Sequence, residues 1–251
     1  MTSELTFISP DWPAPARVKA VTTTRAGGVS RGPYASFNLG DHVGDDPAAV
    51  SRNRESLRAA LSLPAEPIWL RQVHGTHIVD AAHGVIGGEG DGAWSAQPGV
   101  VCAVLTADCL PVFLCDRGGT EVALLHAGWR GLAAGVIEQG VGVMGSDPAG
   151  LLAWLGPAIG ARAFEVGLEV REAFVRHDPQ AAQAFTMGRP DRFHADLYAL
   201  AQRRLAALGV EAIYGGGWCT FTDRDRFFSY RRDPVCGRMA SLIWLEPVGG
   251  Y

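Results

Sequence analysis

The sequence contains few histidines, and their arrangement excludes one class of metalloenzyme. The chain of 251 residues has seven of them: His42, His74, His77, His83, His126, His177 and His194. No two are separated by a single residue. An oxidase that relays electrons from a blue copper to a copper cluster needs more imidazole ligands, many in His-x-His pairs. The supply of ligands therefore excludes a multicopper relay.

Lysine, paired cysteines and long apolar runs are also scarce. Lys19 is the one lysine among 22 basic residues, and the net charge is −4, so neither nucleic acid nor an anionic membrane is expected as a partner. The five cysteines form no Cys-x-x-Cys pair, and residues 1–7 lack a signal-peptide pattern, which predicts reduced thiols in the cytoplasm. The longest apolar run, residues 100–105, is too short to span a membrane.

What the chain does contain is typical of a globular domain. It is 47% hydrophobic and 19% charged, which is enough apolar material for a substantial core. Its 32 glycines and 15 prolines predict many tight turns. Because no linker, low-complexity segment or repeat is visible, we expect a single domain over residues 1–251. No pattern marks an obligate protein interface.

Apolar periodicity predicts strands that alternate with helices. We expect strands at 18–24, 68–73, 78–80, 100–106, 112–115, 121–125, 212–214 and 240–245, the second and third forming a strand or hairpin around Gly75. Helices are expected at 47–61, 131–144, 165–177 and 196–208. This alternation indicates an α/β fold with a mixed sheet. Gly140, Gly142 and Gly145 match a dinucleotide-binding pattern, but they follow a helix, so that function is not expected.

Three segments place a metal-ligand residue at or just past the end of an apolar strand. They are Arg71-Gln72-Val73-His74-Gly75, the stretch from Leu105 to Pro111 that contains Cys109, and the stretch from Leu125 to Gly131 that contains His126. Two imidazoles and a thiolate suit Zn²⁺ with a water as fourth ligand, and such a metal lowers the pKa of its water to about 7. The alternative is that Cys109 and both histidines are core residues.

The third segment also suggests an anion site. A glycine-containing turn, residues 127–131, leads into the predicted helix and would present free N–H groups, to which Arg130 could add a bidentate contact. The alternative is an ordinary strand-to-helix turn with a solvated Arg130.

Together these segments resemble one family along nearly the whole chain, from about Val21 to Leu245. The family is known as laccase-domain or multicopper polyphenol oxidase proteins, and also as peptidoglycan editing factor; its members are understood as purine nucleoside phosphorylases with adenosine deaminase activity. The motifs that carry the resemblance are Phe37–Gly40, Gln72–Gly75, Thr106–Pro111, His126–Gly131, Gly156–Gly160, Phe164–Val166 and Phe228–Asp233.

The resemblance implies a fold, a metal and a reaction. The fold is a layered α/β sandwich with mixed sheets. The metal, usually taken as zinc with copper possible at the same site, falls on His74, Cys109 and His126. The ligands are phosphate and a purine nucleoside (adenosine, inosine or methylthioadenosine), which would yield the free base and ribose 1-phosphate. On resemblance alone, Asn38 and Asp91 approach the pocket.

Other residues have expected roles in substrate binding and proton transfer. Arg130 is the expected phosphate ligand, with Arg71 and the pair Arg231-Arg232 as alternatives, and Gln72 is a further candidate for substrate binding. Asp108, next to Cys109, is the candidate carboxylate for proton transfer in deamination. Its alternative role is to cap a turn or to support the site from behind.

The same residues would also fit two other functions. Cys109 and His126 could form a nucleophile–base pair, oriented by Asp108 or His74, that cleaves an amide or ester in a cell-wall precursor. A single copper at the same three ligands could instead give weak polyphenol oxidation. Metal content distinguishes the first of these from a zinc enzyme.

Overall fold

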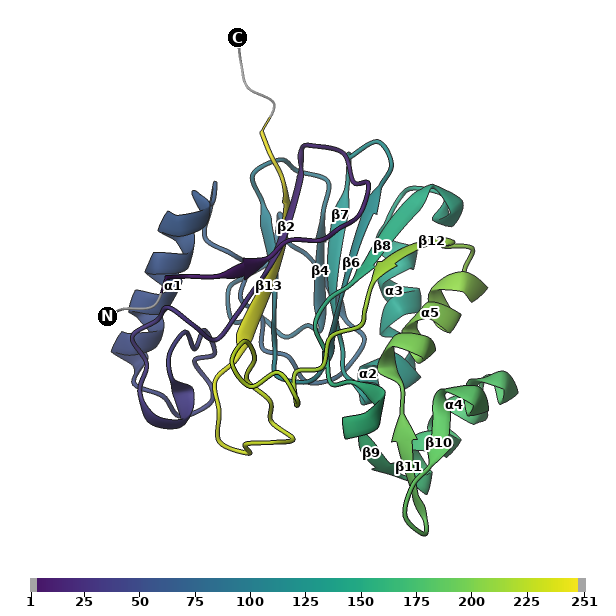
Figure 1. Cartoon of the computed structure of the whole chain (residues 1–251). Helices are drawn as coiled ribbons and strands as arrows, with labels where there is room; N and C mark the ends of the chain where they lie inside the picture. Colours follow the sequence, from purple (N-terminus) through teal and green to yellow (C-terminus); the bar gives the residue numbers. More distant parts are fainter. Residues whose placement is uncertain (1–3, 248–251) are drawn as a thin grey trace.

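Five apolar strands are buried along their whole length. They are β5 (Val101–Thr106), β6 (Leu110–Asp116), β7 (Val122–Ala127), β8 (Leu151–Leu155) and β13 (Met239–Leu245). A strand that is apolar on both faces must be covered on both sides. The computed structural model, which describes residues 4–247, achieves this by stacking two sheets between layers of helices (Figure 1).

The first sheet is antiparallel, with strand order β1-β2-β13-β5, where β1 is Phe7–Ile8 and β2 is Val18–Thr23. Its outer face packs on α1 (Pro47–Leu61) through alternate residues such as Val101, Ala103 and Leu242, which meet Leu57. As predicted, Asp46 begins this helix by accepting a hydrogen bond from the Ala48 N–H.

The second sheet is mixed, with strand order β12-β8-β6-β7-β4-β3. Its added strands are β3 (Ile78–Asp80), β4 (Gly92–Ser95) and β12 (Ala212–Gly215), and the β3–β4 and β8–β12 pairs are parallel. One face packs on the first sheet. The other packs on α2 (Trp129–Ala134), α3 (Val136–Val143) and α5 (Leu197–Ala207). The predicted layered α/β architecture with mixed sheets is confirmed.

A small third sheet, β10-β11-β9, lies beside these helices with α4 (Leu168–Val175). Its strands are β9 (Glu165–Gly167), β10 (Phe185–Met187) and β11 (Arg192–Ala195). The predicted helix over 165–177 is therefore wrong in its first turn, because residues 165–167 pair with β11. Four short 3₁₀ helices complete the described chain: η1 (Gly32–Tyr34), η2 (Pro148–Gly150), η3 (Ala161–Ala163) and η4 (Pro179–Ala184).

Two further predictions need correction. The helix expected over 131–144 begins earlier, at Trp129, and is split by Gly135, whose φ of +104° cannot continue a right-handed helix. Residues 68–73 form no strand, only isolated bridges at Ile68 and Arg71. The side-chain amide of Gln72 takes the place of backbone pairing there, because it bonds both the N–H and the carbonyl of Leu105. Within residues 4–247, no helix is long and apolar enough to span a membrane.

Candidate active site

Cys109 and His126 lie where the chain crosses between the two sheets. Cys109 occupies the turn between β5 of the first sheet and β6 of the second. His126 is the penultimate residue of β7 and pairs with Pro111 of β6. It has the same orientation on the strand as Leu124, which packs between the sheets. Cys109 and His126 therefore lie at one end of the core between the two sheets.

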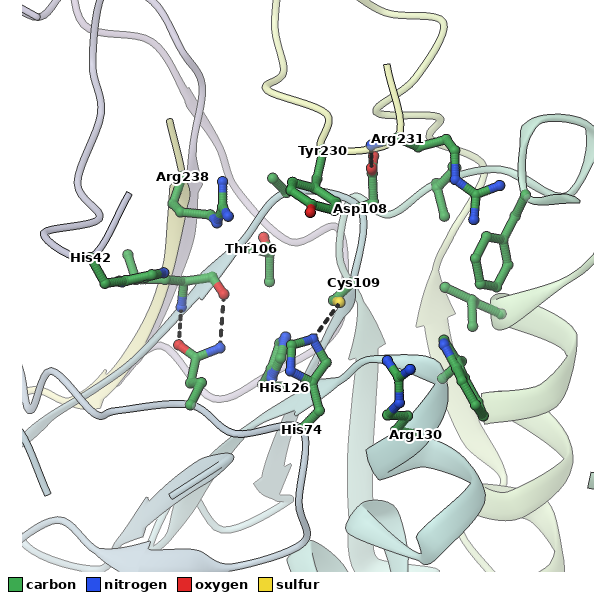
Figure 2. Close-up of a pocket in the computed structure, with 17 residues that line it drawn as sticks. His42, His74, Thr106, Asp108, Cys109, His126, Arg130, Tyr230, Arg231 and Arg238 are labelled. Atoms are coloured by element: carbon green, nitrogen blue, oxygen red, sulfur yellow. Dashed lines mark hydrogen bonds between the residues drawn. The ribbon is translucent and has the colours of Figure 1, made fainter. Parts of the chain in front are cut away.

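His74 completes a three-residue cluster with them. His74 Nε2 lies 3.7 Å from Cys109 Sγ, and the ligand atoms of all three residues lie within 4.8 Å of one another (Figure 2). Within residues 4–247 this is the one group of three His, Cys, Asp or Glu side chains placed to hold a metal ion. His126 is buried, Cys109 is half-buried and His74 is exposed, so the cluster is open on one side.

One buried carboxylate positions both histidines. Asp91, just before β4, accepts hydrogen bonds from the backbone N–H groups of Val73, His74 and Gly75, and so holds His74 at its φ of +61°. Asp91 Oδ1 also lies 2.8 Å from His126 Nδ1. Since Nδ1 is engaged, Nε2 of His126 is the nitrogen left for the cluster. Asp91 is the organising residue that the sequence suggested only through family resemblance.

The electrostatics of the cluster favour a thiolate. Burial raises the pKa of Cys109, but attraction to His126 and hydrogen bonds from His126 and His74 outweigh it and lower the pKa to about 6. For His126 the effects have the opposite sign. Burial lowers its pKa, but the Cys109 thiolate and the Asp91 carboxylate outweigh burial and raise the pKa to about 9. Without a metal, Cys109 and His126 therefore form a thiolate–imidazolium pair at pH 7.

Gly128 packs against the cluster, and any larger residue at this position would displace Cys109 or His74. A Cβ atom on Gly128 would lie 2.9 Å from Cys109 Sγ and 2.8 Å from His74 Cδ2. Because Gly128 has an ordinary φ of −63°, its requirement is steric and not conformational. The backbone at Gly128 therefore lies directly against both side chains.

The cluster faces a cavity of about 540 Å³. Figure 2 shows His42, Thr106 and Arg238 on one side of Cys109, and Arg130 and Arg231 on the other. Apolar side chains complete its walls, among them Leu105, Ile159, Phe164 and Leu197. A cavity of this size with a few convergent polar groups is typical of a small-molecule site.

The cavity is cationic although the chain carries a net charge of −4. Arg130 stacks over Trp129, with 4.6 Å from its Cζ atom to the ring centroid, and Arg231 stacks in the same way over Phe164 at 5.3 Å. Across residues 4–247, neither these two guanidinium groups nor that of Arg238 has a carboxylate within 4 Å. Arginines that line a concave site and have no carboxylate partner attract an anionic ligand.

The Asp108 carboxylate lines the cavity but is already engaged. Its Oδ1 accepts from the Thr220 hydroxyl at 2.6 Å, and its Oδ2 accepts from the backbone N–H of Arg231 at 2.7 Å. The buried guanidinium of Arg232 fastens the same segment by donating to the carbonyls of Thr220, Phe221 and Phe227. Of the two roles that the sequence left open for Asp108, these contacts favour the anchoring one.

Three predicted substrate ligands have other surroundings. Arg71 pairs with Glu89 on the surface and does not line the cavity. Gln72 lines it, but its amide is used by Leu105. Asn38 is fully buried and does not line it; its Oδ1 accepts from the N–H groups of Gly40 and Arg238.

Among the polar cavity residues that received no role from the sequence are His42, Tyr230 and Arg238. Tyr230 lay within a recognised motif, the tail Phe228–Asp233. Nothing local in that motif shows that the tail folds over the β5–β6 turn.

Comparisons with known proteins identify the family. Residues 19–246 match the family model described as "Multi-copper polyphenol oxidoreductase laccase". The chain is 56% identical over 241 residues to a purine nucleoside phosphorylase of Pseudomonas aeruginosa, covering 96% of this chain and 98% of the relative. It is 55% identical over 240 residues to a purine nucleoside phosphorylase of Escherichia coli K12, covering 95% and 98%.

A solved structure shows the same fold. The crystal structure of a Neisseria meningitidis protein is similar with a TM-score of 0.93 and 53% identity, covering 96% of this chain and 99% of that one. The layered arrangement described above is therefore shared along almost the full length of both chains.

Proposed function

The chain belongs to the multi-copper polyphenol oxidoreductase laccase family, and from this membership we propose that it is a zinc-dependent purine nucleoside phosphorylase with adenosine deaminase activity. It converts adenosine, inosine or methylthioadenosine and phosphate to the free purine and the corresponding ribose 1-phosphate. Two relatives that match almost the whole chain carry the phosphorylase name. The observation that carries the proposal is the cavity in which arginines without a carboxylate partner lie beside a His, Cys, His cluster.

The donor set fits a zinc ion held by His74, Cys109 and His126. Two imidazoles and a low-pKa thiolate are borderline ligands that suit zinc, and the open side of the cluster leaves room for a fourth ligand. When bound, zinc would polarise a water or a substrate oxygen. The same donors would also accept copper, so copper loading is a control in any activity assay.

Arg130 and Arg231 are the proposed phosphate ligands. In phosphorolysis a phosphate oxygen attacks C1′ of the ribose while the bond from C1′ to N9 of the purine breaks. The reaction therefore needs an anion held beside a sugar that becomes positively charged. Two guanidinium groups on one side of Cys109 match a dianion (Figure 2). Arg231 Nη1 donates to the Glu165 carbonyl at 2.7 Å, so the other nitrogens of Arg231 and the guanidinium of Arg130 would hold the phosphate.

Product analysis tests the proposal. Inosine and adenosine are incubated with the zinc-loaded protein, with and without phosphate, and the products are identified by mass spectrometry. We expect hypoxanthine and ribose 1-phosphate from inosine only when phosphate is present, and inosine from adenosine without it. Base release that does not depend on phosphate would replace phosphorolysis with hydrolysis. No product from any nucleoside would refute the proposal.

The Asp91–His126 bond gives specific support to a second candidate. Asp91, His126 and Cys109 line up as carboxylate, imidazolium and thiolate, the arrangement that activates a nucleophilic cysteine. In this arrangement Asp91 orients the His126 ring, whereas the sequence pointed to Asp108 or His74 for that role. Such a site would cleave an amide or ester, for example in a cell-wall precursor. A thioester trapped on Cys109 in zinc-free protein would favour it, whereas stoichiometric zinc after purification favours the phosphorylase.

A further inference from the structure

Arg238 is held rigidly at the side of the cavity that the phosphate proposal does not use. Asn38 Oδ1 accepts from the Arg238 backbone N–H at 2.9 Å. The aliphatic part of the side chain lies against Gly40, where a Cβ atom would come within 2.8 Å of Arg238 Cγ. Nη1 donates to the carbonyls of Cys236 and Gly237, both at 3.0 Å. The guanidinium is thus positioned before any ligand arrives.

Two further donors of Arg238, which lines the cavity, have no protein acceptor. Within the described part of the chain, Nε and Nη2 have no hydrogen-bond partner and no carboxylate within 4 Å. The ring of Tyr230 lies 5.8 Å from the Arg238 Cζ atom and offers a flat face beside it. This side therefore presents a directed pair of N–H donors next to an aromatic ring.

Thr106 adds a buried hydroxyl with no partner. Its side chain is 1% exposed and lines the same cavity, and Oγ1 has no hydrogen-bond partner among the described residues. A buried polar group without a partner destabilises the fold, so a hydroxyl at this position points to a ligand that satisfies it. Figure 2 shows Thr106 between Arg238 and Cys109.

The charge on this side is smaller than on the other. Burial, followed by the positive charge of Arg238, lowers the pKa of His42, so its imidazole is neutral at pH 7. One guanidinium with a neutral imidazole and a hydroxyl suits a neutral heterocycle, whereas Arg130 and Arg231 together suit a dianion. The two substrates of a phosphorolysis differ in this way.

We propose that Arg238 and Thr106 bind the purine base, with the Arg238 guanidinium donating to O6 and N7 of a 6-oxopurine beside the ring of Tyr230. The inference rests on the proposed phosphorylase function. Arginine recognises guanine in this bidentate manner because O6 and N7 both accept. A 6-aminopurine places an N–H donor where O6 would be, opposite a group that can only donate. Inosine and guanosine are therefore the preferred substrates for phosphorolysis.

The preference also orders the two proposed activities. In deamination of adenosine, water adds at C6, the bond from C6 to the amino group breaks and ammonia leaves, so a donor is replaced by the oxygen acceptor that Arg238 requires. Inosine formed in this way would be bound for phosphorolysis better than adenosine itself.

Steady-state kinetics with matched variants tests this assignment. We expect Arg238→Met and Arg238→Lys to lower kcat/KM for inosine phosphorolysis roughly 10- to 100-fold, with little change for adenine release from adenosine. Lysine keeps the charge but loses the bidentate fork. Arg130→Met, the control, should raise the KM for phosphate and leave the inosine-to-adenosine ratio unchanged. If Arg238→Met raises the KM for phosphate and lowers both nucleosides equally, the assignment is overturned.

Calorimetry of the free bases tests the subsite without turnover. Hypoxanthine should bind the wild-type protein more tightly than adenine, and Arg238→Met should remove the difference. Equal binding of both bases by the wild-type protein would overturn the base assignment even if phosphorolysis is confirmed. Hypoxanthine-selective binding without phosphate-dependent turnover would instead uphold the subsite and refute the proposed reaction.

Thr106→Val tests the hydroxyl separately from folding. Because valine removes an unsatisfied buried group at similar volume, the midpoint of thermal unfolding should stay the same or rise. Hypoxanthine affinity should nevertheless fall several-fold. Unchanged hypoxanthine affinity would remove Thr106 from the subsite.

Discussion

Oδ1 of Asp91 lies 2.8 Å from Nδ1 of His126, and both side chains are almost completely buried. The same carboxylate accepts the backbone N–H groups of residues 73–75, which carry His74. Two proposed metal ligands from distant parts of the chain therefore depend on one acid. Replacing Asp91 should therefore disturb the positions of His74 and His126 at once.

Asp91→Asn should weaken zinc binding about 10- to 100-fold, the usual effect of losing a carboxylate that orients a ligating histidine. The amide would present an N–H to groups that are themselves donors, so we also expect the free energy of unfolding to fall by about 1–3 kcal/mol. Competition with a chelator and urea unfolding measure the two effects. Asp80→Asn is the control, because Asp80 contacts the exposed His83. Unchanged zinc affinity would contradict the role of Asp91.

Gly128→Ala should reduce zinc binding without unfolding the protein. The added methyl group would press on Cys109 Sγ and His74 Cδ2, and overpacking of this kind typically costs about 1–3 kcal/mol. Gly142→Ala is the matched control, since a Cβ there meets no atom within 4 Å and the residue lies in α3. That control should be neutral or stabilising by about 0.5–1 kcal/mol. Equal zinc affinity in both variants would show that the close approach at Gly128 is unimportant.

Zinc affinity should rise with pH across the neutral range. The pKa of His126 is raised to about 9, so between about pH 6 and 9 its imidazole must lose a proton before it can bind metal. Affinity should therefore increase about tenfold per pH unit there. Below the Cys109 pKa of about 6, a second proton is displaced and the dependence becomes steeper. Calorimetry at pH 7 in two buffers of different ionisation enthalpy should show release of about one proton. Release of none would contradict the thiolate–imidazolium pair.

Asp108→Asn should act through the segment that carries Arg231. The neutral amide would keep one acceptor oxygen for the Arg231 N–H and lose the charge-assisted bonds that both groups now make, so that segment should loosen and the KM for phosphate should rise. The pH profile of deamination should keep its shape. Loss of one limb of that profile, with the KM for phosphate unchanged, would instead identify Asp108 as the acid–base group of the deaminase.

Much of the fold was accessible from local sequence patterns, because strands such as β5 and β7 are apolar on both faces and helices such as α1 carry their own start signal. The segment 68–73 was not, since its apolar pattern resembles a strand while the Gln72 amide replaces the backbone pairing. Nor was β9, whose residues pair with residues of β11 that lie 25 to 29 positions further along. Pairing with a distant segment decided both outcomes.

The candidate site divides in the same way. His74, Cys109 and His126 could be proposed from residue type and motif, and the structure brings them together. Arg238 could not, because its place in the cavity depends on Asn38 and Gly40, some 200 residues earlier in the chain. Asn38 itself was expected at the substrate and lies behind Arg238. Sequence motifs identified the ligand types, whereas the residues that shape the cavity are set by tertiary contacts.

The most direct test of the proposed function is phosphate-dependent release of hypoxanthine from inosine by zinc-loaded wild-type protein and by Cys109→Ala. Cys219→Ala serves as control, because its thiol is half-buried and does not line the cavity. We predict that the wild-type protein and the control release hypoxanthine with ribose 1-phosphate as co-product, and that Cys109→Ala releases none. Undiminished, phosphate-dependent release by metal-free Cys109→Ala would contradict the assignment of this cluster as the centre of catalysis.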